Sequence, residues 1–134
     1  MDVSALGVAL ILVGVATTYG GPGEAWFDGR PLYCGCGATY DVDAPPWVAV
    51  DVSEYESGRV RCGDELWMTF EGGGKLRARA MDAGYLYGHD TLLGGPIVVD
   101  VPAHLAATRF DGLARVRVVN HSAARRELER YVER

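Results

Sequence analysis

The chain has 134 residues and a formal net charge of -5, from 13 basic and 18 acidic side chains. This length suits one domain of about 100–150 residues and nearly excludes two independent cores. Hydrophobic residues make up 49% of the chain, which excludes a disordered protein, and the negative charge argues against a nucleic acid partner. The 18 glycines suit a turn-rich β fold better than a helical bundle.

The charge is divided unevenly along the chain. Residues 41–71 carry eight acids and two arginines, whereas residues 72–134 carry ten bases and seven acids. Charge runs are most often solvated surface, so we interpret this division as exposed loops facing a basic second half.

The chain begins with an uncharged apolar segment at residues 3–16. It is shorter than the roughly 20 residues that a membrane-spanning helix needs, but its length and the small residues Gly14 and Ala16 are typical of an export signal. We therefore predict a hydrophobic leader over residues 1–16, acting as a signal peptide or as an anchor in contact with a membrane. The alternative is a buried strand or a packed arm, retained in an assembled particle.

Short apolar or alternating segments in the rest of the chain predict strands. Residues 75–81 give the clearest pattern, because apolar side chains alternate there with basic ones. Residues 24–46 resemble a loop, Pro102 begins a short helix over 103–109, and residues 121–134 form a charged helix with one apolar face. The expected strands are 16–19, 47–52 (a strand or a buried turn), 65–70, 75–81, 96–101 and 114–119. At least five short strands with one inserted helix match a small closed β-barrel.

The chain has three cysteines, Cys34, Cys36 and Cys62. The first two are too close for an easy mutual bridge. A bridge from one of them to Cys62 would close a loop of about 26–28 residues and stabilise the fold by roughly 3 kcal/mol. We take Cys36 and Cys62 as the pair, with free thiols as the alternative. The histidines lack the spacing of a zinc site, so no metal is expected.

Several short motifs occur in a characteristic order. They are Ala16-Thr17-Thr18-Tyr19-Gly20, Phe27-Asp28-Gly29, Cys34-Gly35-Cys36, Cys62-Gly63-Asp64, Asp82-Ala83-Gly84 and Val98-Val99-Asp100-Val101-Pro102. Over about residues 16–120 this order resembles the double-psi β-barrel of rare lipoprotein A, the barwin-like proteins and the expansin N-terminal domain. The resemblance implies a mainly β fold: a six-stranded double-psi β-barrel over residues 17–120 with a short inserted helix, which the C-terminal helix expected over 121–134 follows.

The resemblance also implies a function. In that family the barrel binds β-linked glycans in an open groove. Its members include lytic transglycosylases that act on peptidoglycan, small endoglucanases that use two aspartates, and expansins that loosen walls without hydrolysis. By the family pattern Asp100 and Asp82 match the catalytic carboxyls, and Thr18 and Tyr19 match the Thr/Tyr pair of the first strand.

The residues themselves support these roles. Asp100 lies in an apolar run, and apolar surroundings raise the pKa of a carboxyl, so that it can act as a general acid. Asp82 lies beside a glycine-containing loop and is the better solvated candidate for the base. Four aromatic residues are candidates for stacking on sugar rings: Trp26, Trp47, Tyr85 and Tyr87. The simpler alternatives are that Asp100 caps the following helix, that Asp82 is a turn residue, and that the tryptophans are core residues.

Three functions remain open at this point. The chain could be an exported enzyme acting on a cell-wall glycan, a non-catalytic wall-binding barrel, or a structural component of a phage tail or other extracellular assembly. The expected partner is a cell-wall polysaccharide, with assembly partners in the third case, and no cofactor is expected. The expected location is secreted or in the cell envelope, with a virion-associated location as the alternative. The sequence favours the cell-wall glycan role.

Overall fold

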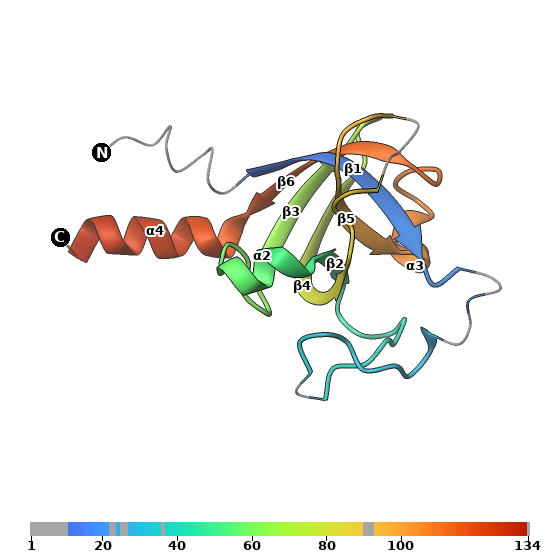
Figure 1. Cartoon of the computed structure of the whole chain (residues 1–134), viewed down its shortest axis with the longest axis horizontal. Helices are drawn as coiled ribbons and strands as arrows, with labels where there is room; N and C mark the ends of the chain where they lie inside the picture. The colour runs from blue at the N-terminus through green and yellow to red at the C-terminus, as the bar shows by residue number, and fades with distance from the viewer. Residues whose placement is uncertain (1–10, 22–23, 25–26, 36, 90–92, 134) are drawn as a thin grey trace.

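The computed structural model describes residues 11–133, except residues 22–23, 25–26, 36 and 90–92. Six strands close into a barrel in the order β1-β5-β2-β4-β3-β6 (Figure 1). The strands are β1 (Ile11–Tyr19), β2 (Trp47–Asp51), β3 (Glu65–Phe70), β4 (Lys75–Gly84), β5 (Ile97–Pro102) and β6 (Ala114–Asn120). The expected mainly β, six-stranded barrel is confirmed.

The barrel is mixed. β1 runs parallel to β5 and β2 runs parallel to β4, whereas the other four pairs are antiparallel. Each parallel pair contains a shift in register, between Val15 and Ala16 in the first and between Val48 and Ala49 in the second. Such an irregularity re-aims the side chains that follow it.

These two register shifts lie close to the residues of the candidate site. Thr17 pairs with Asp100 one residue beyond the first pair after the first shift, and Ala49 pairs with Asp82 directly after the second shift. Ala49 also pairs with Asp100 across the antiparallel β2–β5 contact. The strands therefore bring both acidic residues to one small region of the barrel.

Apolar side chains from all six strands fill the barrel. Burying one large apolar side chain stabilises a fold by about 1.5–3 kcal/mol, so this core is the main source of stability. Its largest fully buried members include Leu66, Met68, Phe70, Val50, Val99 and Val118. A second cluster consists of Tyr19, Leu32, Tyr40, Trp47 and Ala49. It joins the strands to residues 27–35 and 37–46, which we call the covering segment.

In the described part of the chain the strands are accompanied by the helices α2 (Val52–Ser57), α3 (Ala103–Ala106) and α4 (His121–Glu133). α4 extends away from the barrel (Figure 1). Arg126 in its second turn donates from Nη1 to Asp64 Oδ1 at 2.7 Å and from Nη2 to Oδ2 at 3.0 Å, which fixes α4 to the barrel. Among the helices that the structure describes, none combines the length and apolar character needed to cross a bilayer.

The predicted boundary between leader and barrel, after residue 16, falls inside β1. Residues 11–16 pair with β6, and Val15 and Ala16 are buried in the core, so residues 11–16 are part of the barrel. A Cβ at Gly14 would overlap the carbonyl oxygen of Pro96, so the small residue here permits close strand approach. An uncharged apolar run is typical of a buried strand as well as of a leader, so the sequence pattern did not distinguish the two. The rest of the predicted leader, residues 1–10, lies outside the described residues.

Candidate functional site

A pocket of about 220 Å³ lies between the barrel and the covering segment. It contains both candidate carboxyls and a positively charged side chain. The strands contribute Tyr19, Ala49, Asp82 and Asp100, and the covering segment contributes Phe27, Arg30, Leu32 and Tyr40. The pocket thus combines acid–base groups with an aromatic wall, which is typical of small-molecule binding sites.

Asp100 in β5 is largely buried. The neighbouring Thr17 of β1 donates a hydrogen bond from Oγ1 to Asp100 Oδ1 at 2.9 Å. Burial raises the pKa of Asp100 to about 6, and the nearby charge of Asp82 acts in the same direction, against the lowering effect of the Thr17 hydrogen bond. The capping alternative is wrong, because Pro102 is the N-cap of α3 and no side-chain hydrogen bond caps that helix.

Asp82 lies within strand β4, so it is not a turn residue. Its Oδ2 accepts a hydrogen bond from the Tyr19 hydroxyl and its Oδ1 accepts one from the Tyr33 N–H, both at 3.1 Å. The Tyr19 hydroxyl itself accepts from Trp47 Nε1 at 3.1 Å. Burial raises the pKa of Tyr19 above its ordinary value, so this hydroxyl stays neutral and donates to Asp82. The side chain of Asp82 is therefore held at both oxygens.

The structure does not bring Thr18 to the pocket. Thr18 is exposed and lines a different surface with α3, where Ala103 and Ala106 lie. The hydroxyl beside Asp100 belongs to Thr17, which sequence reasoning missed. The register shift in β1 decides which of the two neighbouring threonines faces Asp100, and no sequence signal marks that shift.

The predicted aromatic residues are scattered. Trp47 is buried and acts through its hydrogen bond to Tyr19, whereas Tyr85 is 83% exposed and is not part of the pocket. The Tyr87 hydroxyl donates to Glu54 Oε1 at 2.8 Å, beside α2. Trp26 lies outside the described residues.

The aromatic wall of the pocket consists of three other rings. Tyr19 and Phe27 have ring centroids 5.4 Å apart, Phe27 and Tyr40 5.6 Å, and Tyr19 and Tyr40 5.9 Å. Tyr19 contacts both other rings edge to face, which stabilises by about 0.5–1.5 kcal/mol beyond burial, whereas the Phe27 and Tyr40 rings are tilted by 30°. Neither Phe27 nor Tyr40 was predicted to contact a ligand, because both lie in the part interpreted as a loop.

A disulfide joins Cys34 to Cys62, with Cα atoms 5.6 Å apart. The choice of Cys36 as the partner of Cys62 is wrong, and Cys36 itself lies outside the described residues. The backbone explains the pairing: the Cys34 N–H donates to Met81 O at 3.0 Å, and the Gly63 N–H donates to Ala80 O at 2.9 Å. Both cysteines are thus held beside the same part of β4.

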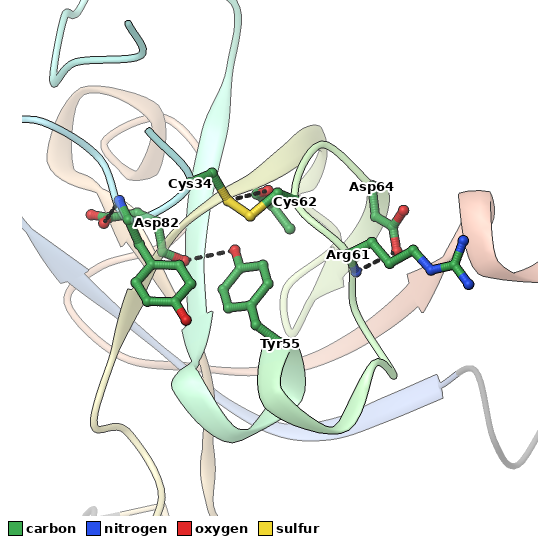
Figure 2. The surroundings of a disulfide bond; sticks show 8 residues. Cys34, Tyr55, Arg61, Cys62, Asp64 and Asp82 are labelled. Carbon is green, nitrogen blue, oxygen red and sulfur yellow. Dashed lines mark hydrogen bonds between the residues drawn. A yellow bond between two sulfur atoms is a disulfide. The ribbon is translucent and has the colours of Figure 1, made fainter. Parts of the chain in front are cut away.

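Figure 2 shows this disulfide close to Asp82. Tyr33 directly precedes Cys34, so the bridge helps to hold the Tyr33 N–H on Asp82. The Tyr55 hydroxyl donates to the backbone oxygen of Asp82 at 2.8 Å, and the Tyr33 and Tyr55 rings stack with centroids 5.0 Å apart. The disulfide therefore fixes the environment of Asp82 as well as the covering segment.

Within the described ranges no three His, Cys, Asp or Glu side chains come together in a way that could hold a metal ion.

No protein-family model matches the chain, and no curated protein matches it. Among solved structures, the chain is similar to the apo form of an expansin from Clavibacter michiganensis, with a TM-score of 0.56 and 22% sequence identity. The match covers 82% of this chain and 50% of that one, so the chain spans about half the length of the expansin. At this identity the likeness shows the fold alone, an expansin-like double-psi β-barrel, as the order of motifs implied.

Proposed function

We propose that the chain acts on a cell-wall polysaccharide of the peptidoglycan type, with Asp100 as the acid/base group. One observation carries this proposal: a carboxyl with a pKa raised to about 6 lines a pocket with an aromatic wall. Such a carboxyl keeps its proton at mildly acidic pH and can donate it to a glycosidic oxygen.

The surroundings of the two carboxyls favour a reaction that needs only one of them. A glycoside hydrolase uses a second carboxyl as nucleophile or base. Here both oxygens of Asp82 accept hydrogen bonds from the protein, so we assign Asp82 a positioning role with Tyr19. This arrangement supports a lytic transglycosylase, in which a hydroxyl of the sugar is the nucleophile.

In the proposed reaction Asp100 gives up its proton and later takes up another, so that it ends in its starting state. Asp100 donates its proton to the glycosidic oxygen while the bond from that oxygen to the anomeric carbon breaks. A hydroxyl of the same sugar then forms the new bond to the anomeric carbon, and Asp100 takes up the proton of that hydroxyl. The products are a shortened glycan and an anhydro sugar end, and Asp100 is again protonated.

The disulfide supports a location outside the reducing cytosol. Disulfides such as Cys34–Cys62 persist in oxidising compartments and are rare in cytosolic proteins. We therefore propose a secreted or cell-envelope protein, in agreement with a cell-wall substrate.

A second candidate function is binding without cleavage. The observation that favours it is that Asp100 is the one pocket carboxyl whose oxygens are not both engaged by hydrogen bonds within the described part of the chain. The aromatic wall and Asp100 would then bind sugars together, with no proton transfer. In that case Asp100→Asn weakens binding but removes no product.

The two candidates differ in an incubation of the full chain with peptidoglycan, followed by mass spectrometry of the soluble fragments. The full chain is needed because residues 11–16 are part of the barrel. The matched control is Asp111→Asn, which changes an exposed aspartate outside the pocket. We expect anhydro ends with the wild type and the control, and none with Asp100→Asn.

Each of the other outcomes would support a different function. Hydrated reducing ends would indicate a hydrolase and contradict the transglycosylase reaction. No fragments, with protein that still pellets with the wall, would leave the binding function. Neither fragments nor pelleting would contradict both candidates and favour a structural component of an assembly.

A further inference from the structure

We propose that the outer surface of β4, β3 and β6 is a second binding site, for an acidic polysaccharide that carries carboxylates. We call this surface the cationic face. Its basic residues are Lys75, Arg77 and Arg79 of β4 and Arg115 and Arg117 of β6. The proposal goes beyond the pocket, because none of these residues lines it, and it holds whether or not the chain cleaves a glycan.

The alternation of the strands places these five side chains outside the barrel. In β4 the exposed basic residues alternate with buried apolar ones, from Leu76 to Ala80, and in β6 they alternate with Val116 and Val118. Period-2 alternation puts all residues of one parity on one face of a sheet. All five cations are classed as exposed, so their charged groups are available to a ligand.

The strand register gathers them on one surface. β3 lies between β4 and β6, and its Thr69 pairs with Lys75 on one side and with Arg117 on the other. Since neighbouring strands lie about 4.8 Å apart, the backbones of Lys75 and Arg117 are separated by roughly 10 Å. The basic residues of the second half of the sequence, which are far apart in the chain, therefore form one continuous face.

Few acids balance this charge. Glu65 is paired in register with Arg79, and Glu71 forms an ion pair with Arg115 at 3.1 Å, in which both side chains are 58% exposed. In the part of the chain that the structure describes, Arg115 is the one member of the cationic face in an ion pair. Five cations beside two acids, on a protein of net charge -5, form a local positive potential that attracts anions.

The centre of the face is rigid. The guanidinium of Arg77 lies 4.0 Å from the centroid of the Trp67 ring, and the His121 ring stacks on Trp67 at 4.4 Å with an interplanar angle of 8°. A stacked guanidinium is partly pre-organised, so less side-chain freedom is lost when it binds a ligand. Trp67 Nε1 is buried and has no acceptor among the described residues.

The composition of the face favours an acidic polysaccharide. Four of the five cations are arginines, whose planar fork binds a carboxylate with two hydrogen bonds. Successive basic residues of one strand are about 6.6–6.8 Å apart, which suits a linear polymer with charges at regular intervals. Both faces of Trp67 are occupied, so the surface offers no free ring for the base stacking on which single-stranded nucleic acid binding depends.

The test measures binding of the full chain to fluorescently labelled polygalacturonate by anisotropy. The variant is Lys75→Gln with Arg117→Gln, since neither side chain is in an ion pair within the described ranges. Each cation near an anionic surface contributes about fivefold to affinity, so we expect a loss of about 25-fold. The control is Arg125→Gln with Arg130→Gln on α4, which removes the same charge from exposed positions elsewhere, and we expect binding close to that of the wild type.

Further measurements identify the ligand class. Affinity should fall between about 50 mM and about 200 mM salt, and the Lys75/Arg117 variant should have a salt slope smaller by about two. Equal losses in the α4 control, equal binding of a neutral glucan, or tighter binding of a single-stranded oligonucleotide or anionic lipid vesicles would overturn the proposal. Asp100→Asn should bind polygalacturonate like the wild type, which keeps this test separate from the function of the pocket.

Discussion

The two walls of the pocket are held in place by different interactions. The barrel wall consists of strands that pair on both sides and share a continuous apolar core. The described part of the covering segment consists mainly of turns and irregular chain, with Phe27 in a 3-10 turn and an isolated bridge between Pro31 and Thr39. It is attached by the Cys34–Cys62 disulfide, by ring contacts of Tyr40 and by a few backbone hydrogen bonds.

Because of this difference, the two walls contribute differently to the pocket. The barrel register places Thr17, Asp82 and Asp100, whereas the covering segment adds Arg30 and most of the aromatic wall. A regular sheet distributes its stability over many contacts, and the covering segment depends on a few specific ones. Substitutions in the two walls should therefore differ in size and kind.

The largest effect is expected in the barrel core. Phe70→Ala removes a side chain that is 2% exposed and lies 4.7 Å from the Phe110 ring centroid. We expect the free energy of unfolding to fall by about 3–5 kcal/mol, because a cavity remains. Urea denaturation measures this change. As a control, Tyr85→Ala at an 83% exposed position should change stability by less than about 0.5 kcal/mol. Similar losses in both variants would contradict the assignment of the core.

The next effect concerns the attachment of the covering segment. Cys34→Ser opens a bridge between residues 28 positions apart and should lower the free energy of unfolding by roughly 3 kcal/mol. Hydrogen exchange should also become faster at the Tyr33 N–H, which loses its fixed position on Asp82. Cys36→Ser is the matched control and should keep the wild-type stability. If instead Cys36→Ser is destabilised and Cys34→Ser is not, the pairing is wrong.

The third effect depends on pH. The folded protein raises the pKa of Asp100 from 3.8 to about 6, so between these values the folded state binds the proton more tightly than the unfolded chain. This group therefore destabilises the fold increasingly as pH rises from about 4 to about 6, and the cost is constant above that.

Asp100→Asn removes this cost. We expect the variant to be more stable than the wild type at pH 8 by about 3 kcal/mol and nearly equal to it at pH 4. Denaturation curves at both pH values test the sign. A variant that is less stable than the wild type at pH 8 would show that the charged form of Asp100 is not penalised.

The smallest effect is expected where the two walls meet. Tyr19→Phe removes the hydroxyl that accepts from Trp47 and donates to Asp82, and should cost about 1 kcal/mol, typical of one buried hydrogen-bond partner. Tyr40→Phe is the comparison, because its hydroxyl donates only a long 3.4 Å hydrogen bond to Gly20 O. Thermal unfolding of both variants is the measurement, and an equal or larger loss in Tyr40→Phe would contradict the proposed order.

The sequence pattern predicted the barrel where period-2 alternation is strong. Residues 65–70, 75–81 and 114–119 correspond to β3, β4 and β6, whose inner and outer faces differ sharply in polarity. Helix α2 was missed although its signals are present. Asp51 caps it through the Ser53 N–H, and Gly58 ends it in a left-handed conformation.

The site was less predictable because it depends on how distant segments meet. The chemistry of Asp100 follows from its apolar neighbours, but the choice of Thr17 over Thr18 depends on a register shift between strands. The disulfide partner depends on the path of the covering segment along β4, and two cysteines separated by one residue offer no local signal for that path. Tertiary contacts, which local patterns do not encode, decide both cases.

The most direct measurement is a carbon-13 NMR titration of the aspartate carboxyls in the full chain. Asp100→Asn identifies the resonance of Asp100. We expect this resonance to titrate with a midpoint near the pKa of about 6 that burial in the pocket produces. A midpoint below about 4.5, close to the ordinary value for aspartate, would contradict the role of Asp100 as the proton donor.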